Sequence, residues 1–301
     1  MNVACVSGMA LQKRVHLAAN RLFAALRTRA KLPDMPRFFP TALLLVLGGG
    51  PALALPPCAP AVEIRDLPIA RVEPNGFLVA TDGRAIKLEG ILLPGGARDH
   101  APQYLADQAG DALHGLAAGH MVTAAAAVPK EDRYGRLRAQ VFAADDGDRW
   151  IQDALLRQGL ARVSIEPDRH ECVKELYAAE ADARARRAGI WTLAAYAIRM
   201  AGDVPKNDLG TFQIVQGTVT GVSVRAGRAY INFGNDWKTD FTATVAPEDL
   251  KAFRDAGVDP QSYAGKTIRV RGIVERHDGP EIELATPDDV ETVSGLRPPQ
   301  R

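Results

Sequence analysis

Cysteine and histidine are scarce in this sequence. The 301 residues include three cysteines and six histidines, and these do not occur at the short spacings that zinc ligands show. We therefore predict no zinc site. The chain does not have the composition of a disordered protein either, since 47% of its residues are hydrophobic, and its length suits two globular units.

A large excess of charge of either sign is also missing. The whole chain has a net charge of +1, but residues 1–54 carry seven Lys or Arg and one Asp. The remaining residues carry 30 basic and 35 acidic side chains, a net charge of −5. Because duplex nucleic acid is held mainly by Lys and Arg on its phosphates, this balance argues against strong non-specific binding. The net charge does not exclude a local basic groove.

The apolar run at residues 41–55 is too short for a comfortable membrane span. It is interrupted by three glycines and Pro51, and a spanning helix needs roughly 20 apolar residues. A basic stretch ending at Arg37, this run, and the small residues Ala52 and Ala54 are together typical of a secretory signal. We predict that residues 1–54 are a leader, that the mature chain is periplasmic or extracellular, and that it has no stable membrane span. A bilayer anchor is the alternative, and a start at Met35 would make residues 1–34 an upstream mis-start.

Cleavage after Ala54 would remove Cys5 and leave only Cys58 and Cys172. An exported protein matures where disulfides are permitted. We therefore name Cys58 and Cys172 as a candidate disulfide. Two unpaired thiols are the alternative, because the sequence does not show that the two residues come within bonding range.

The pattern from residue 76 to residue 189 contains both strand and helix signals. An Asp82-Gly83 turn between two apolar stretches is typical of a hairpin. Strands are predicted at residues 76–81, 85–88, 122–128 and 137–143, and helices at 102–118, 149–158 and in a long segment ending at Gly189. Asp168 and Glu171 have the spacing of a capping box before that last helix. The order is compatible with a β-barrel with flanking helices, an α+β arrangement.

Three blocks in this region carry a more specific signal. They are the segments 132–137, 150–161 and 189–191, which read DRYGRL, WIQDALLRQGLA and GIW. In this order they resemble successive signatures of the staphylococcal nuclease-like (thermonuclease) family. The resemblance implies a nuclease-type OB barrel over residues 62–196.

A second β-rich region follows a polar segment at residues 197–209, which we interpret as a linker. Strands are predicted at 212–224, 230–233, 240–245, 267–275 and 281–285, with a helix at 247–256. Three strands, a helix and two strands is the order of an OB-type barrel. We therefore predict an OB-like domain over residues 210–295 and a tail at 296–301.

The family resemblance implies where catalysis would occur. In such nucleases acidic side chains hold calcium, a further carboxylate helps to activate water, and two arginines bind the scissile phosphate. Here the motif positions of the two metal-binding acids fall on Asn75 and Leu92, and that of the general base falls on Gly95. Lys87 replaces the first arginine, and Arg136 matches the second. We therefore expect no intact catalytic set, no metal and no cofactor.

Hydrolysis would require displaced acids. Four acidic residues lie near these positions in the sequence: Glu73, Asp82, Glu89 and Asp99. If they formed a relocated cluster, the chain would be a calcium-dependent phosphodiesterase. We favour the simpler interpretation that they are solubilising charges near turns.

Ligand-binding candidates remain in both regions. Lys87 and Arg136 would contact a phosphate if they share one concave face, although Arg136 also suits a structural role in its turn, which we favour. In the second region aromatic residues occur beside Arg225, Arg228 and Lys238, as in a base-stacking platform. They are Tyr230, Phe233, Trp237 and Phe241, and the alternate spacing of strand residues places at least one of them in the core. Trp237, in a polar turn, is the best surface candidate.

The charges of the last predicted helix have a plainer interpretation. Arg184, Arg186 and Arg187 are interspersed with Glu180 and Asp182, which indicates a solvated helix face.

The sequence thus favours an exported protein that resembles a nuclease, has lost hydrolysis, and serves as a binding or scaffold module. Its expected partner is single-stranded nucleic acid or another polyanion, bound weakly, and no protein partner is identified. The alternatives are an active calcium-dependent phosphodiesterase with displaced acids and a structural envelope protein.

Overall fold

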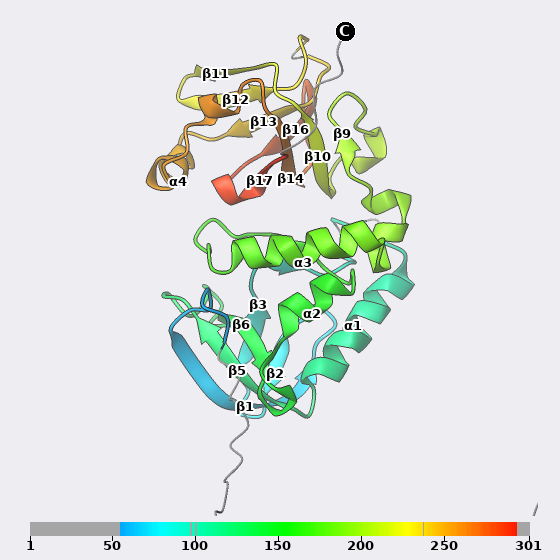
Figure 1. Cartoon of the computed structure of the whole chain (residues 1–301), viewed down its shortest axis with the longest axis vertical. Coiled ribbons are helices and arrows are strands. Elements are labelled where there is room, and N and C mark those ends of the chain that lie inside the picture. The colour runs from blue at the N-terminus through cyan, green and yellow to red at the C-terminus, as the bar shows by residue number, and fades with distance from the viewer. Residues whose placement is uncertain (1–54, 97, 100, 237, 294–301) are drawn as a thin grey trace, which may run out of the picture. The chain divides into compact units, whose positions relative to one another are not determined.

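β3 (Ala85–Leu88) and β6 (Leu137–Ala143) pair in parallel and close a five-stranded barrel. The computed structural model describes residues 55–96, 98–99, 101–236 and 238–293, so the predicted leader and tail lie outside the described residues. The other barrel strands are β1 (Val62–Val72), β2 (Leu78–Ala80) and β5 (Met121–Ala126). Their order, β3-β2-β1-β5-β6 with β3 joined to β6, confirms the predicted barrel (Figure 1).

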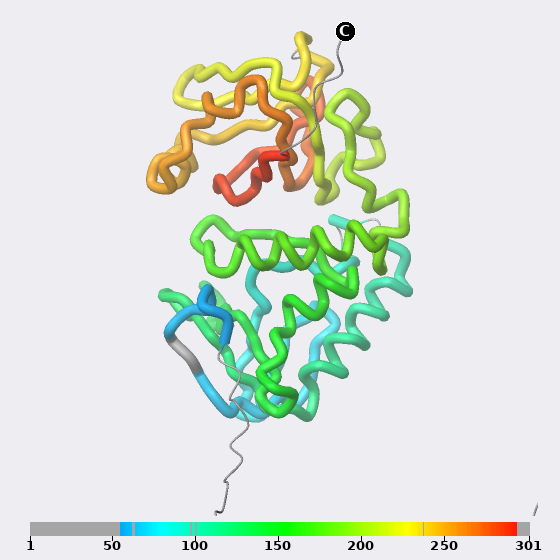
Figure 2. Tube along the Cα trace, in the orientation of Figure 1, coloured from blue at the N-terminus to red at the C-terminus, as the bar shows by residue number. Residues whose placement is uncertain are grey.

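The β2–β3 hairpin forms as the Asp-Gly signal predicted. Gly83 has a φ of 88°, a conformation that glycine adopts without strain, and the Asp82 carboxylate accepts a hydrogen bond from the Arg84 backbone N–H. β3 then lies beside β6 although the two are far apart in the sequence (Figure 2). This parallel contact places Lys87 opposite Arg138, and both side chains form ion pairs with Glu89.

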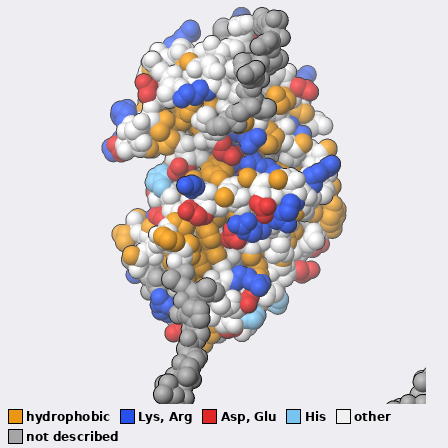
Figure 3. All heavy atoms as spheres, in the orientation of Figure 1, with side chains coloured by type: hydrophobic (Ala, Val, Ile, Leu, Met, Phe, Trp, Pro, Cys, Tyr) orange, Lys and Arg blue, Asp and Glu red, His pale blue; other side chains and the backbone are white. Residues whose placement is uncertain are grey.

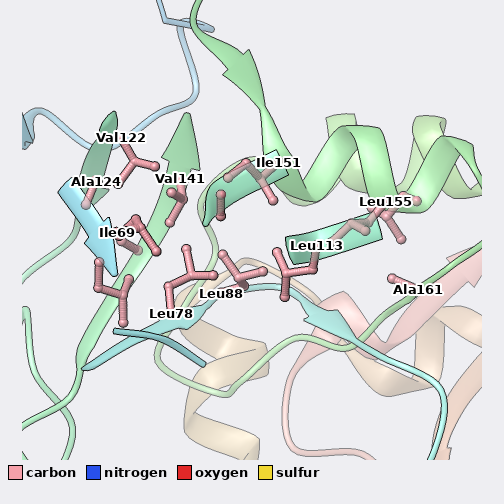
Figure 4. Close-up of a cluster of buried hydrophobic side chains, with 14 of the residues drawn as sticks. Ile69, Leu78, Leu88, Leu113, Val122, Ala124, Val141, Ile151, Leu155 and Ala161 are labelled. Atoms are coloured by element: carbon pink, nitrogen blue, oxygen red, sulfur yellow. The ribbon is translucent and has the colours of Figure 1, made fainter. Parts of the chain in front are cut away.

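Three helices flank the barrel. They are α1 (Gln103–Ala117), α2 (Ile151–Arg157) and α3 (Val173–Arg186). α1 buries Leu105, Ala109, Leu113 and Ala117, which recur every four residues and so form one face. Figure 4 shows side chains of the strands and helices, among them Ile69, Leu88, Leu113, Val141 and Leu155, pointing into one core.

The predicted capping box before α3 is wrong. The helix begins after Cys172, which has a left-handed backbone conformation, and no side chain caps it. Asp168 is instead bound to the Arg138 guanidinium, at 2.8 Å. Cys172 is joined to Cys58 by a disulfide, so the chain just before β1 is covalently tied to the start of α3.

The C-terminal region contains two further sheets around a second core. One consists of β9 (Arg199–Met200), β10 (Phe212–Thr218), β14 (Thr267–Ile273) and β17 (Val290–Thr292). The other consists of β11 (Gly221–Arg225), β12 (Arg228–Asn232), β13 (Thr242–Val245), β15 (Glu275–His277) and β16 (Gly279–Glu283). α4 (Leu250–Asp255) follows β13. The predicted second closed barrel is not confirmed.

Two boundaries in this region differ from the sequence prediction. The single strand expected at residues 212–224 is divided into β10 and β11, because β10 pairs with β14 while β11 pairs with β12. The segment expected as a linker, residues 197–209, contains β9, which pairs in parallel with β10.

The remaining short strands complete the first region. β4 (Ile91–Leu92) pairs with β8 (Arg162–Val163), and β7 (Arg149–Trp150) pairs with the end of β6. Across the described ranges, no helix has both the length and the apolar character needed to cross a bilayer. Residues 41–54 of the predicted apolar run lie outside the described residues.

Candidate functional site in the first barrel

The structure brings four of the predicted site residues together in one cleft. Asn75, Lys87, Leu92 and Gly95 all line a cavity of about 450 Å³ beside β3, β4 and α1. Arg136 does not line this cavity. Phe77 does, and the Cζ atom of Arg136 lies 4.5 Å from the centroid of the Phe77 ring. Four of the positions named from the sequence therefore share one cleft, and its chemistry depends on what their side chains offer.

Asn75 is used locally. Its carboxamide oxygen accepts a hydrogen bond from the Phe77 backbone N–H at 3.1 Å and so stabilises the turn before β2. The side chain is otherwise exposed. A neutral amide committed to its own turn is a poor substitute for a metal-binding carboxylate.

The backbone at Gly95 disfavours a carboxylate side chain. Gly95 has a φ of 110°, and a Cβ atom built there would lie 3.0 Å from the Cβ of Ala106 on α1. The Asp99 carboxylate accepts a hydrogen bond from the Gly95 N–H at 2.9 Å and helps to hold this conformation. A glutamate at position 95 would thus meet both backbone strain and a close contact.

Leu92 gives the cleft an apolar wall where the family resemblance implies a metal ligand. Its place is fixed by the pairing of β4 with β8, in which Leu92 lies opposite Arg162. The lining continues through Leu93 and Pro94. A leucine side chain has no atom that can coordinate a hard cation.

Lys87 is the cation of the cleft, and it already has acidic partners. Its ammonium group lies 3.5 Å from the Glu89 carboxylate and forms an ion pair with Glu166. One quarter of the side chain is exposed. Burial lowers the pKa of Lys87, although the negative charge of Glu89 opposes that effect.

Arg136 has the partners of a structural turn residue. Its Nε donates to the Asp132 carboxylate at 2.7 Å, and its guanidinium lies over the rings of Phe77 and Tyr134. Burial opposes ionisation of Asp132, but hydrogen bonds from Arg136 and from the Tyr134 N–H lower its pKa to about 2. These contacts favour the turn interpretation over phosphate binding.

The four acids that might have formed a relocated metal site remain separate. Glu73 pairs with Arg71, and Asp82 pairs with Arg84. Glu89 is buried against Arg138, while Asp99 accepts a hydrogen bond from Tyr196. Across the part of the chain that the structure describes, the only group of three potential ligands is Cys58, Cys172 and Glu175, and its two sulfur atoms form the disulfide.

Sequence reasoning missed a buried charge network next to the cleft. Arg138 on β6 and Glu89 after β3 are 7% and 3% exposed, and Arg138 Nε donates to Glu89 Oε1 at 3.1 Å. The signal was a charged residue in each of two mainly apolar stretches, Glu89 within residues 85–93 and Arg138 within residues 137–143. Such residues predict a buried ion pair once the two strands are known to adjoin. The sequence did not show that they adjoin.

The predicted stacking platform in the C-terminal region is only partly formed. Phe241 is fully buried, and Phe233 packs against it with ring centroids 5.2 Å apart, so both belong to the second core. Tyr230 lines a separate groove of about 670 Å³ with Arg225 and Arg228. Arg228 is bound there by Glu283. Trp237, the preferred surface candidate, lies outside the described residues.

The comparison with family models is consistent with this geometry. Residues 85–193 match the model described as staphylococcal nuclease homologue. Residues 85–193 are a staphylococcal nuclease homologue domain. Lys87, Leu92, Gly95 and Arg136 fall inside the matched span, whereas Asn75 precedes it. The comparison with curated proteins returned no match. A nuclease-homologue domain supports a nuclease-like or nucleic-acid-binding module.

Proposed function

We propose that this chain is an exported, non-hydrolytic binding module built on the nuclease-homologue domain, and that its cleft binds single-stranded nucleic acid weakly. One observation carries the proposal: Asn75, Leu92 and Gly95, at the motif positions that bear carboxylates in the family, line the cleft without one. The acid in the described lining, Glu73, is paired with Arg71. One carboxylate already paired with an arginine and one amide oxygen used in its own turn are a poor metal site, and Gly95, at the general-base position, has no side chain to activate water.

The cleft lining supports binding of a nucleobase more than of a bare phosphate. Phe77, Leu93 and Pro94 offer apolar and aromatic surface, and Lys87 is the single cation of the lining. Base stacking on an aromatic ring contributes about 1–3 kcal/mol in single-strand-binding proteins. One lysine already paired with acids adds little, so affinity should be low and only weakly salt-dependent.

The charge distribution of the surface agrees with weak binding. On the face shown in Figure 3, basic and acidic side chains are interleaved rather than gathered into a basic area. A protein that binds nucleic acid through many phosphates needs such an area.

A binding titration tests the proposal. Fluorescently labelled single-stranded DNA and RNA are titrated with the purified chain at low salt, and anisotropy is recorded. We expect saturable binding that weakens in Lys87→Ala and is unchanged in Lys251→Ala, since Lys251 is an exposed lysine on α4, paired with Asp255. If neither nucleic acid binds at low salt, the binding proposal is wrong and the structural envelope alternative is favoured.

A further inference from the structure

Six charged side chains form one network beside the cleft, which we call the Arg138 cluster. Its members are Lys87, Glu89, Arg138, Glu166, Asp168 and Arg169. They come from β3, the turn between β3 and β4, β6, and the segment between β8 and α3. The cluster adjoins the cleft through Lys87, which belongs to both.

The cluster has a buried cationic part and an exposed acidic part. The Arg138 and Arg169 side chains are 7% and 4% exposed, and Glu89 is 3% exposed. Glu166 and Asp168, in contrast, are 42% and 53% exposed. The cluster contains three cations, Lys87, Arg138 and Arg169, and one buried acid, Glu89. Glu89 therefore leaves two positive charges without a buried counter-charge. The two exposed carboxylates supply the balancing charge.

The cations are held in place without the exposed acids. Glu89 accepts hydrogen bonds from Nε and Nη2 of Arg138, at 3.1 and 3.2 Å. Arg169 donates to the backbone carbonyl of Pro129. These contacts do not involve the side chains of Glu166 or Asp168, so they would hold the two guanidinium groups if those carboxylates turned away. The Nε of Arg169 is buried and has no hydrogen-bond partner.

The two exposed carboxylates bind the outer nitrogens of the Arg138 guanidinium. Asp168 bonds to both Nη1 and Nη2 of Arg138 at 2.8 Å, and Glu166 bonds to the same Nη2 and to Lys87. An arginine fork that binds a carboxylate at two points binds phosphate oxygens with the same geometry. Two carboxylates meeting at one guanidinium nitrogen also repel each other, which favours their exchange for a single ligand of equal charge.

We propose that the Arg138 cluster is a binding site for a phosphate dianion, and that Glu166 and Asp168 act as internal competitors for it. This inference deepens the proposed binding function and rests on it. Displacing the carboxylates of Glu166 and Asp168 leaves two positive charges in the cluster, which a dianion neutralises. A phosphodiester carries one negative charge and would neutralise only half of them. A phosphate monoester carries close to two negative charges above pH 7. The ligand is therefore a terminal phosphate of a nucleic acid strand or free phosphate.

The test removes the competitors and keeps the cations. In Glu166→Gln/Asp168→Asn both carboxylates become neutral amides. The matched control is Asp153→Asn/Asp182→Asn, which removes the same charge from acids that pair with Arg157 and Arg186 on α2 and α3. Binding of inorganic phosphate is measured by calorimetry at pH 7.5 and constant ionic strength, with chloride as the monoanion reference. A 5′-phosphorylated oligothymidylate is compared with its 5′-hydroxyl form.

We expect the Glu166→Gln/Asp168→Asn chain to bind inorganic phosphate about tenfold more tightly than the parent, because two charge-assisted contacts no longer compete. The control should match the parent, and adding Lys87→Gln should reverse the gain. A gain for the phosphorylated strand over its hydroxyl form assigns the site to a strand end; a gain for inorganic phosphate alone assigns it to free phosphate.

The proposal is overturned if the double variant binds phosphate no more tightly than the control. If the double variant does not fold, as judged by circular dichroism, the single variants Glu166→Gln and Asp168→Asn must each show a partial gain, and no gain in either overturns it equally. Failure of the proposed function would look different: the 5′-hydroxyl strand would not bind the parent chain, whatever phosphate does.

Discussion

The guanidinium of Arg271 on β14 and the carboxylate of Glu180 on α3 form a two-point ion pair that is hidden from solvent. Nη1 lies 3.2 Å from Oε1 and Nη2 lies 3.0 Å from Oε2, and the side chains are 1% and 0% exposed. Arg271 also donates to the carbonyl of Val163 and to Glu291. The prediction that Glu180 belongs to a solvated helix face is therefore wrong.

This pair predicts a large stability effect from a single change. Glu180→Gln leaves the Arg271 charge buried without its main partner, and it should lower the free energy of unfolding by about 3–5 kcal/mol. The control is Asp182→Asn, which removes an exposed partner of Arg186 and should cost less than about 1 kcal/mol. Urea unfolding followed by circular dichroism measures both. Equal effects would show that burial of the pair contributes nothing.

Asp289 predicts a pH dependence of stability. Burial raises the pKa of Asp289 to about 7. Hydrogen bonds from the backbone N–H groups of Thr286 and Ala285, and the positive charge of Arg271, lower this pKa but do not outweigh burial. The folded state therefore binds a proton that the unfolded state releases near pH 4, so this residue's contribution to stability falls as pH rises from about 4 to 7.

Asp289→Asn should remove that dependence. The amide keeps a hydrogen-bond acceptor and carries no charge, so the variant should gain stability over the parent by about 2–4 kcal/mol at pH 8, while the difference shrinks toward pH 4. Unfolding free energies at several pH values give the difference curve. A variant that parallels the parent from pH 4 to pH 8 would contradict the raised pKa.

Arg136 should be a stability residue rather than a binding residue. Arg136→Ala removes its bonds to Asp132 and its contacts with Phe77 and Tyr134, so we expect a loss of about 1–3 kcal/mol of unfolding free energy. Oligonucleotide affinity should change less than twofold. Because the Asp132 pKa is lowered to about 2, the pair's contribution is present above pH 4 and is lost as pH falls toward 2. Loss of binding in a fully stable Arg136→Ala chain would restore the phosphate interpretation.

The disulfide between Cys58 and Cys172 predicts a constraint on the unfolded chain. The two cysteines are separated by 114 positions in the sequence. Replacing both by serine should lower the free energy of unfolding by about 2–5 kcal/mol. Alkylation of the denatured, unreduced mature chain, followed by mass measurement, should detect no free thiol. Two alkylated cysteines would show that the bond does not form after export.

Much of the first barrel could be predicted because its signals are local. The Asp82-Gly83 turn gave the hairpin, and the apolar stretch at Leu137–Ala143 gave β6 with its bounds. β1 was not predicted, since its strand from Val62 to Val72 contains Asp66 and Pro68, which weaken a strand pattern.

The candidate site was predictable as positions but not as contacts. Family motifs indicated Lys87, Leu92 and Gly95, which do share one cleft with Asn75. The partners of Lys87 and Arg138 come from the loop that holds Asp168, 30 residues after Arg138, and from the parallel pairing of β3 with β6. Such contacts depend on barrel closure, which residue spacing within a single element does not reveal.

We propose that the nuclease-homologue domain has a cleft at the expected positions but no hydrolytic activity. The most direct measurement incubates the purified chain with single-stranded DNA and RNA, once with calcium and once with chelator, and resolves the products on a denaturing gel. We expect intact substrate in both conditions, equal to a buffer control, because Asn75, Leu92 and Gly95 supply neither a metal-binding carboxylate nor a general base. Chelator-sensitive cleavage that disappears in Arg136→Ala would contradict it.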